Sequence, residues 1–172
     1  MSEARILNKT FSGVGHLDWG VMSVKPEQTS QYKWDKRFIQ LAHLVKGWSK
    51  DERKVGAVLV ADRKVIGMGY NGFPRSVIDM PERYQNKELK RLLMVHAEQN
   101  AIFDVSDKAA MIGATLYATR FPCHACMAAL AQNGIIRVAS PSPEVDHPVW
   151  GESHKASVFI AHESSIELVE MN

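Results

Sequence analysis

Two short stretches, His96-Ala97-Glu98 and Pro122-Cys123-His124-Ala125-Cys126, decide the fold and chemistry of this chain. Cys123 and Cys126 are the only cysteines among its 172 residues. Zn²⁺ prefers cysteine sulfur and histidine nitrogen as ligands, and a catalytic zinc site keeps one of its four coordination positions for water. His96, Cys123 and Cys126 supply three ligands and leave the fourth position open. Glu98 is then free to transfer protons instead of binding the metal.

The spacing also predicts where these side chains lie. Residues two apart on a helix point to different sides, so His96 and Glu98 can address one metal only if it lies beyond a helix's first turn. Cys123 and Cys126 are three apart and share a helix face, again in a first turn. The sequence therefore predicts two helix N-termini that point at one zinc ion. There the positive end of the helix dipole favours thiolates.

Other interpretations of these residues explain less. A closed structural zinc site needs a fourth protein ligand, and the nearest candidate, His124, adjoins Cys123 and would face the wrong way. A redox pair or disulfide of the two cysteines would not require the upstream His-x-Glu. A non-enzymatic zinc module has no use for the Glu98 carboxylate. A second zinc ion is not expected, because no cysteine is left over.

Length and composition describe an ordinary globular protein. The chain is one domain long, with 45% apolar and 23% charged residues. A formal net charge of +2 is too small to indicate a nucleic-acid partner. We find no N-terminal signal and no apolar run of about 18 residues, so we expect neither export nor a membrane span. Reduced thiols that bind a metal predict a cytoplasmic protein.

Hydrophobic periodicity predicts the order of the elements. Residues 1–33 have no clear period, and we expect an extension that lies over the domain, or over a neighbouring subunit, before a domain at residues 34–172. Strands are expected at 55–60, 65–70, 114–119, 135–139 and 166–169, and helices at 34–48, 92–103, 122–133 and 150–162. Residues 76–90 are polar and predict an exposed loop with a helical turn. Strands alternate with helices after an opening hairpin, which predicts a three-layer α/β/α domain with a mixed sheet.

Several motifs taken together resemble a known family. They are Val55-Gly56-Ala57-Val58, Gly69-Tyr70-Asn71-Gly72-Phe73-Pro74, His96-Ala97-Glu98-Gln99-Asn100-Ala101, Tyr117-Ala118-Thr119 and Phe121-Pro122-Cys123-x-x-Cys126. The pattern H-x-E followed by P-C-x-x-C is the signature of zinc nucleobase deaminases. With the other motifs, the chain from Trp34 to about Met171 resembles the deoxycytidylate (dCMP) deaminases of the cytidine deaminase superfamily. The resemblance implies a cytidine-deaminase-like fold with a five-stranded mixed sheet, assembled as dimers or hexamers.

The resemblance also implies roles for individual residues. His96, Cys123 and Cys126 are similar to the zinc ligands of the family, and Glu98 to its proton shuttle. Asn71 resembles the residue that hydrogen-bonds the sugar, although in Asn-Gly it is also an ordinary turn residue. Ala97, Phe121 and Pro122 are placed beside the substrate. The implied reaction is hydrolytic deamination of a cytosine nucleotide, dCMP to dUMP and ammonia, in pyrimidine deoxynucleotide metabolism.

A substrate phosphate needs cations or backbone amides near its oxygens. Arg53, Lys54 and Arg75 are the candidates, because they flank the hairpin strands whose ends carry Asn71; Arg120 and Lys155 are others. Some family members hold the phosphate with basic residues or a Tyr-Arg pair after the fourth strand. This chain instead has the acidic Glu144-Val145-Asp146-His147 there. A neutral nucleoside or a modified pyrimidine is therefore an alternative substrate.

Two related activities are further alternatives. A tRNA or other nucleic-acid deaminase shares the zinc motif but would be expected to have a more basic surface. A riboflavin-pathway deaminase usually continues into a reductase domain, whereas this sequence stops at residue 172. We therefore expect a small-molecule enzyme.

Overall fold

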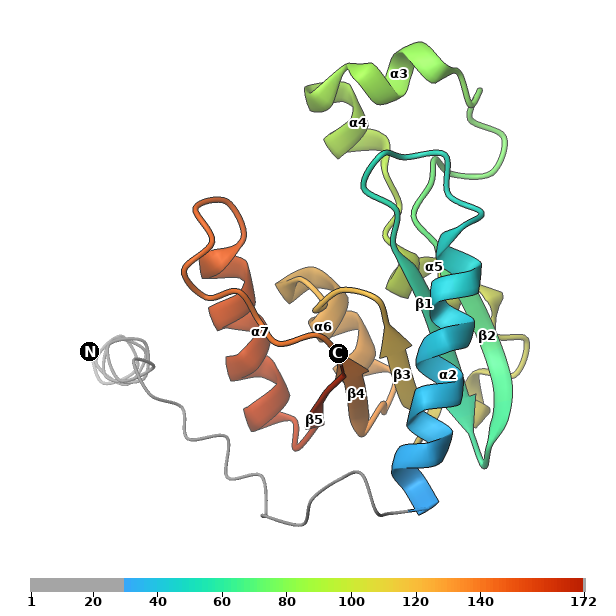
Figure 1. Ribbon diagram of the computed structural model, residues 1–172, viewed down its shortest axis with the longest axis vertical. Helices are drawn as coiled ribbons and strands as arrows, with labels where there is room; N and C mark the ends of the chain where they lie inside the picture. Colours follow the sequence, from blue (N-terminus) through green and yellow to red (C-terminus); the bar gives the residue numbers. More distant parts are fainter. Residues whose placement is uncertain (1–29, 172) are drawn as a thin grey trace.

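The computed structural model describes residues 30–171, and Figure 1 shows a sheet with helices packed around it. The predicted N-terminal extension thus lies almost entirely outside the described residues. The elements are α2 (Ser30–Lys46), β1 (Gly56–Ala61), β2 (Lys64–Tyr70), α3 (Pro81–Gln85), α4 (Lys87–Leu93), α5 (Ala97–Asp104), the 3₁₀ helix η3 (Lys108–Met111), β3 (Thr115–Ala118), α6 (His124–Gln132), β4 (Arg137–Ser140), α7 (Gly151–Glu163) and β5 (Glu167–Glu170).

The five predicted strands form one mixed sheet in the order β2-β1-β3-β4-β5. β1 pairs antiparallel with β2 and β3, whereas β3, β4 and β5 are parallel. One apolar cluster packs α2 against one face of the sheet, and another packs α5, α6 and α7 against the other. The predicted three-layer α/β/α fold is confirmed.

The backbone of α5 lies unusually close to β2, at two positions that have no side chain. A Cβ atom added to Gly69 would lie 2.2 Å from the carbonyl oxygen of Ala97 and 2.3 Å from the nitrogen of Ala101. A Cβ atom at Gly67 would lie 2.4 Å from the carbonyl oxygen of Ala101. Only glycine permits so close an approach of backbone to backbone. These two glycines therefore set the position of α5 on the sheet.

A buried polar cluster joins α2 to the middle of the sheet. Asp35 accepts two hydrogen bonds from Arg137 at 2.9 and 2.8 Å, and one from the Tyr117 hydroxyl at 2.7 Å. Burial alone would raise the pKa of Asp35, but the hydrogen bonds from Arg137, Tyr117 and Gln31 outweigh it and hold that pKa below its usual value. Sequence periodicity gave no sign of this cluster.

Several element boundaries differ from the predicted ones. α2 is described from Ser30 and not from Trp34, because polar residues before Trp34 continue the helix, and the Gln31 side chain bonds to Asp35 at 3.0 Å. Pro122 is not in the first turn of α6, since Cys123 is its N-cap. The helix expected from Leu92 is two helices: Met94 and His96 are extended, so α4 ends at Leu93 and α5 begins at Ala97.

The largest difference is in the segment expected to be a loop. Residues 81–93 form two short helices, α3 and α4, which Figure 1 shows projecting beyond the end of the sheet, next to the loop before β1. Two backbone hydrogen bonds between Gly72 and Val95, at 3.2 and 2.9 Å, close the base of this excursion. The rings of Phe73 and Tyr84 pack within it in a tilted arrangement, with centroids 4.5 Å apart. We call residues 73–94 the helical excursion.

Within residues 30–171, no helix is both long enough and apolar enough to cross a membrane.

We predict that Gly69→Ala destabilises the fold and disturbs the site. The added methyl group would overlap the backbone of α5, and overpacking of this kind costs about 1–3 kcal/mol. Because α5 would have to shift, zinc retention should fall as well. Gly72→Ala is the matched control, since the nearest atom to its added Cβ is 3.8 Å away. Urea unfolding and metal content measure both effects. Equal unfolding midpoints for the two variants would contradict the close-contact argument.

Candidate active site

Three predicted ligands meet where α5 and α6 begin. His96 is the N-cap of α5, Cys123 is the N-cap of α6, and Cys126 follows within the first turn of α6. The Nδ1 atom of His96 lies 3.5 Å from the Cys123 sulfur and 3.4 Å from the Cys126 sulfur. Tetrahedral bonds of about 2.0–2.1 Å to nitrogen and about 2.3 Å to sulfur would put these atoms roughly 3.5 Å apart. The three residues therefore fit one zinc ion.

The cluster contains no further protein ligand of this type. Among the described residues, the ligand atoms that lie within 4.8 Å of one another come from His96, Cys123 and Cys126 alone. The His124 ring instead contacts the Ser153 hydroxyl, with Nδ1 and Oγ 2.9 Å apart. His124 is thus a non-ligand residue, as the sequence predicted.

Glu98 lies beside the ligands, inside the protein. It is the second residue of α5, its side chain is 4% exposed, and its Oε2 atom is 3.6 Å from the Cys126 sulfur. Burial raises the pKa of Glu98. A carboxyl group with a raised pKa holds a proton more readily, so it can donate a proton as well as accept one. The position of Glu98 is therefore suitable for general acid and base catalysis.

The two thiols differ in acidity. A hydrogen bond with Cys126, helped by the His96 ring, lowers the pKa of Cys123 to about 3. The same hydrogen bond, together with burial, raises the pKa of Cys126. Metal binding requires both sulfurs as thiolates, so a proton shared by this pair must leave when a metal binds.

Helix α7 holds the start of α6 in place. The Ser157 hydroxyl, fully buried, donates to the carbonyl oxygen of Pro122 at 2.8 Å. Four residues earlier, the Ser153 hydroxyl accepts from the backbone N–H of His124 at 3.1 Å. These two serines fix the backbone on either side of Cys123. Sequence analysis missed them, and their only sequence signal is two small polar residues at helical spacing.

Asn71 is buried and its side chain is fully hydrogen-bonded within the protein. Its Oδ1 accepts from the backbone N–H of Val55 at 2.8 Å, and its Nδ2 donates to the Arg53 carbonyl at 3.1 Å and to Asp51 at 3.3 Å. Asn71 therefore shapes the loop at residues 51–55. A hydrogen bond from Asn71 to a sugar stays a prediction.

His96, Cys123 and Glu98 line a cleft of about 850 Å³, and Cys126 is buried behind its surface. Of the predicted substrate-binding residues, Asn71, Ala97, Phe121 and Arg53 line the same cleft, as does Arg120.

The other predicted residues lie elsewhere. Pro122 is buried behind the surface. Lys54 and Arg75 lie outside the lining, and the Lys54 ammonium is near the carbonyl of Gly47, at 3.4 Å. Lys155 pairs with Glu152 at 2.7 Å. Further cleft residues, which the sequence did not indicate, are Lys46, Lys87, Lys90, Arg91, His147, Trp150 and His154.

The loop between β4 and α7 forms one wall of the cleft and is organised by two histidines. The Nδ1 atom of His154 accepts from the backbone N–H of Glu144 at 3.0 Å. The Nδ1 atom of His147 accepts from the N–H groups of Val149 and Trp150, both at 3.1 Å. The Nδ1 atom of each ring therefore acts as an acceptor for the loop backbone. Burial lowers the pKa of His154, which favours its neutral form.

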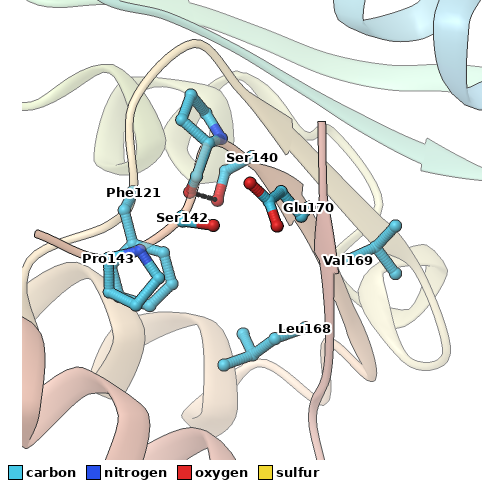
Figure 2. A pocket seen from close by; sticks show the side chains of 8 residues that line it. Phe121, Ser140, Ser142, Pro143, Leu168, Val169 and Glu170 are labelled. Atoms are coloured by element: carbon cyan, nitrogen blue, oxygen red, sulfur yellow. Dashed lines mark hydrogen bonds between the residues drawn. The ribbon is translucent and has the colours of Figure 1, made fainter. Parts of the chain in front are cut away.

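A second hollow lies on the other side of Phe121. Figure 2 shows Phe121 next to Pro143, with Leu168 and Glu170 of β5 facing the same space. Its volume is about 90 Å³. Pockets for small molecules usually hold about 300–1,000 Å³. The large cleft, and not this hollow, therefore has the size of a substrate site.

Comparison with known proteins finds the same deaminase family that the sequence motifs resemble. A family model for the cytidine and deoxycytidylate deaminase zinc-binding region matches residues 32–140. An uncharacterized deaminase encoded in the luxG 3′ region of Aliivibrio fischeri is 37% identical over 138 residues, 79% of this chain and 92% of that protein. The deoxycytidylate deaminase of Mycobacterium phage D29 is 41% identical over 125 residues, 65% of this chain and 97% of that protein.

A solved structure has the same fold. The crystal structure of the dCMP deaminase of cyanophage S-TIM5, in complex with dCMP and dUMP, aligns with a TM-score of 0.63 at 22% identity. The alignment covers 83% of this chain and 98% of that one. At this identity the likeness concerns the fold alone.

We predict about one equivalent of zinc per chain, from the pattern of three protein ligands in catalytic zinc sites. Cys126→Ser should lose most of the metal, because it removes one of three ligands. His124→Ala, which changes an adjacent non-ligand residue, should retain it. Elemental analysis of the purified proteins measures both. Two equivalents in the wild type, or full retention in Cys126→Ser, would contradict the assignment.

Proposed function

This chain belongs to the cytidine and deoxycytidylate deaminases, a family of zinc-dependent hydrolases, and we propose that it converts dCMP to dUMP and ammonia. The observation that carries the proposal is the buried Glu98 carboxyl beside the His96, Cys123 and Cys126 cluster, inside a cleft large enough for a nucleotide. The name of the phage D29 relative supports dCMP as the substrate.

The reaction exchanges the amino group on C4 of cytosine for an oxygen from water. Zinc bound at the three ligands would supply a Lewis acid that makes a water molecule more acidic. Glu98 takes a proton from that water and delivers it to N3 of the ring, while the water oxygen forms a bond to C4. It then takes the second proton of that oxygen and delivers it to the amino group, so that the C4–N bond breaks, ammonia leaves and C4 becomes a carbonyl. Its burial supports this role, because the raised pKa of Glu98 brings its two protonation states closer in energy.

The remaining predicted residues are proposed to hold the substrate. Ala97 and Phe121 line the cleft next to the ligands and are proposed to contact the ring. Phe121 is held edge-on against the His154 ring, with centroids 5.3 Å apart. Asn71 lines the same cleft and is proposed to contact the sugar while it supports the loop at 51–55.

A neutral nucleoside is the second candidate substrate. Glu144 lines the cleft and is exposed, and its carboxylate would repel a phosphate placed against the loop that carries it. Deoxycytidine carries no such charge. The two candidates share the same chemistry at C4, so they differ only in what the outer part of the cleft must bind.

We propose that the enzyme acts in the cytoplasm as a homo-oligomer. Large apolar side chains are exposed on several elements, as expected for surfaces that meet another copy: Leu44, Trp48, Leu92, Phe103 and Ile112 are 54–84% exposed. Light scattering at micromolar concentration should give a multiple of the chain mass. A monomer under these conditions would refute the proposal.

We predict that Glu98→Gln keeps the zinc and the fold while deamination falls at least about 10²-fold, the contribution of a positioned acid-base group. Ammonia release should be measured with dCMP, CMP, deoxycytidine and cytosine. The double variant Glu98→Gln/Gln99→Glu moves the carboxylate to the neighbouring position on the same helix turn. Its deamination rate should stay as low as that of Glu98→Gln. Near-normal turnover by Glu98→Gln would end the mechanism.

A further inference from the structure

We infer that the helical excursion supplies the phosphate site of this enzyme: Lys87 and Arg91 of α4, with Arg53 beside them, bind the 5′-phosphate of the nucleotide whose ring lies at Glu98. This inference rests on the proposed function and names the part of the substrate that the outer cleft recognises. It moves phosphate binding away from the loop after β4, where this chain has Glu144.

The first observation is that α4 faces the cleft with one charged stripe. Lys87, Lys90, Arg91 and Met94 all line the cleft. Residues three and four apart share a helix face, so Lys87, Lys90 and Arg91 are neighbours on one side of α4. The helix also leads directly to the metal ligand, because Arg91 is five residues before His96. Their Cα atoms are therefore at most about 18 Å apart.

The second observation is that the excursion is tied to the body of the protein by charged contacts of its own. Lys90 pairs with Asp51 at 3.0 Å, and both side chains are largely shielded from solvent. At the outer end, Lys50 pairs with Asp79 at 2.7 Å. Asp51 in turn accepts a hydrogen bond from Asn71. These contacts fix α4 against the loop at residues 51–55, which carries Arg53.

The third observation is that some cations of these two walls take no part in such ion pairs. Lys90 is neutralised by Asp51, so it is not counted as a phosphate ligand. Arg53, Lys87 and Arg91 are exposed, and within residues 30–171 the structure gives their charged groups no carboxylate partner. Free guanidinium and ammonium groups on two adjoining walls provide the charge-assisted hydrogen bonds that a phosphate monoester requires.

The fourth observation is the opposite charge across the cleft. The β4–α7 wall contributes Glu144, whose carboxylate lies 4.0 Å from Nε2 of the His147 ring. Glu52 also lines the cleft, next to Arg53, but Lys87 and Arg91 leave the α4 wall with a net positive charge. A phosphate is therefore attracted to the α4 wall and repelled by Glu144. This polarity orients a molecule with one anionic end, such as a nucleoside monophosphate. A nucleic-acid strand would instead require a basic track that continues beyond the cleft.

The test compares kcat/KM for dCMP with kcat/KM for deoxycytidine, measured by ammonia release, in the wild type and in Lys87→Ala/Arg91→Ala. The wild type should prefer dCMP at least about tenfold. The double variant should lose about ten- to hundredfold of that preference, the usual effect of removing charged hydrogen bonds, with deoxycytidine turnover within about twofold of the wild type. Lys33→Ala/Lys64→Ala, which removes two exposed cations outside the cleft lining, is the matched control and should keep the wild-type ratio.

Three outcomes would overturn the inference while the proposed deamination survives. They are equal use of dCMP and deoxycytidine by the wild type, an unchanged ratio in the double variant, and a preference for a cytosine-containing oligonucleotide over dCMP. If the double variant also loses deoxycytidine turnover, the single variants Lys87→Ala and Arg91→Ala decide, each with an expected loss of about tenfold in the ratio. Absence of ammonia from every cytosine compound refutes the proposed function itself, and this inference with it.

Discussion

The contact on which the rest of the site depends is the one between the backbone of α5 and the glycines of β2. Gly67 and Gly69 let the helix lie closer to the sheet than any side chain would allow. The depth of α5 determines where its first residues, His96 and Glu98, emerge. On the other side of the site, Ser157 fixes the carbonyl of Pro122 and thereby the start of α6. Two helix ends, each fixed by a backbone contact, thus form the metal centre without a loop that has to fold around the ion.

The sequence predicted what depends on neighbouring residues and missed what depends on distant ones. Five strands, the layer order and the zinc triad follow from apolar periods and from ligand spacing, which are local patterns. Neither α3 nor α4 contains a buried residue, and contacts such as Lys90 with Asp51 hold α4 in place, so a polar stretch was taken for a loop. Arg137 and Asp35 are 102 positions apart, and nothing in either segment indicates the other. Asn71 was recognised as a site residue, but its bonds to the backbone at 53 and 55 could only come from the folded chain.

The interior of the cleft and its rim have different physical characters. Around the ligands the protein is nearly closed: Glu98 is 4% exposed, and Ala97 is completely buried. Such a site has a low effective dielectric, in which a single carboxyl can hold or release a proton. The rim is open and carries exposed charges of both signs, with Arg53 and Lys87 on one wall and Glu144 on the other. Bond breaking thus takes place in the nearly closed region around the ligands. The open rim provides the long-range attraction of a charged molecule.

The two hydrogen bonds between Gly72 and Val95 hold the two ends of the helical excursion together at its base. Residues 73–94 leave and re-enter the fold at one point, so insertions, deletions or charge changes between them leave β2 and α5 in register. The hydrolytic machinery is encoded entirely outside this interval, at residues 96–98 and 123–126. A different segment between Gly72 and Val95 would therefore change what the rim of the cleft contacts, while the metal ligands keep their positions.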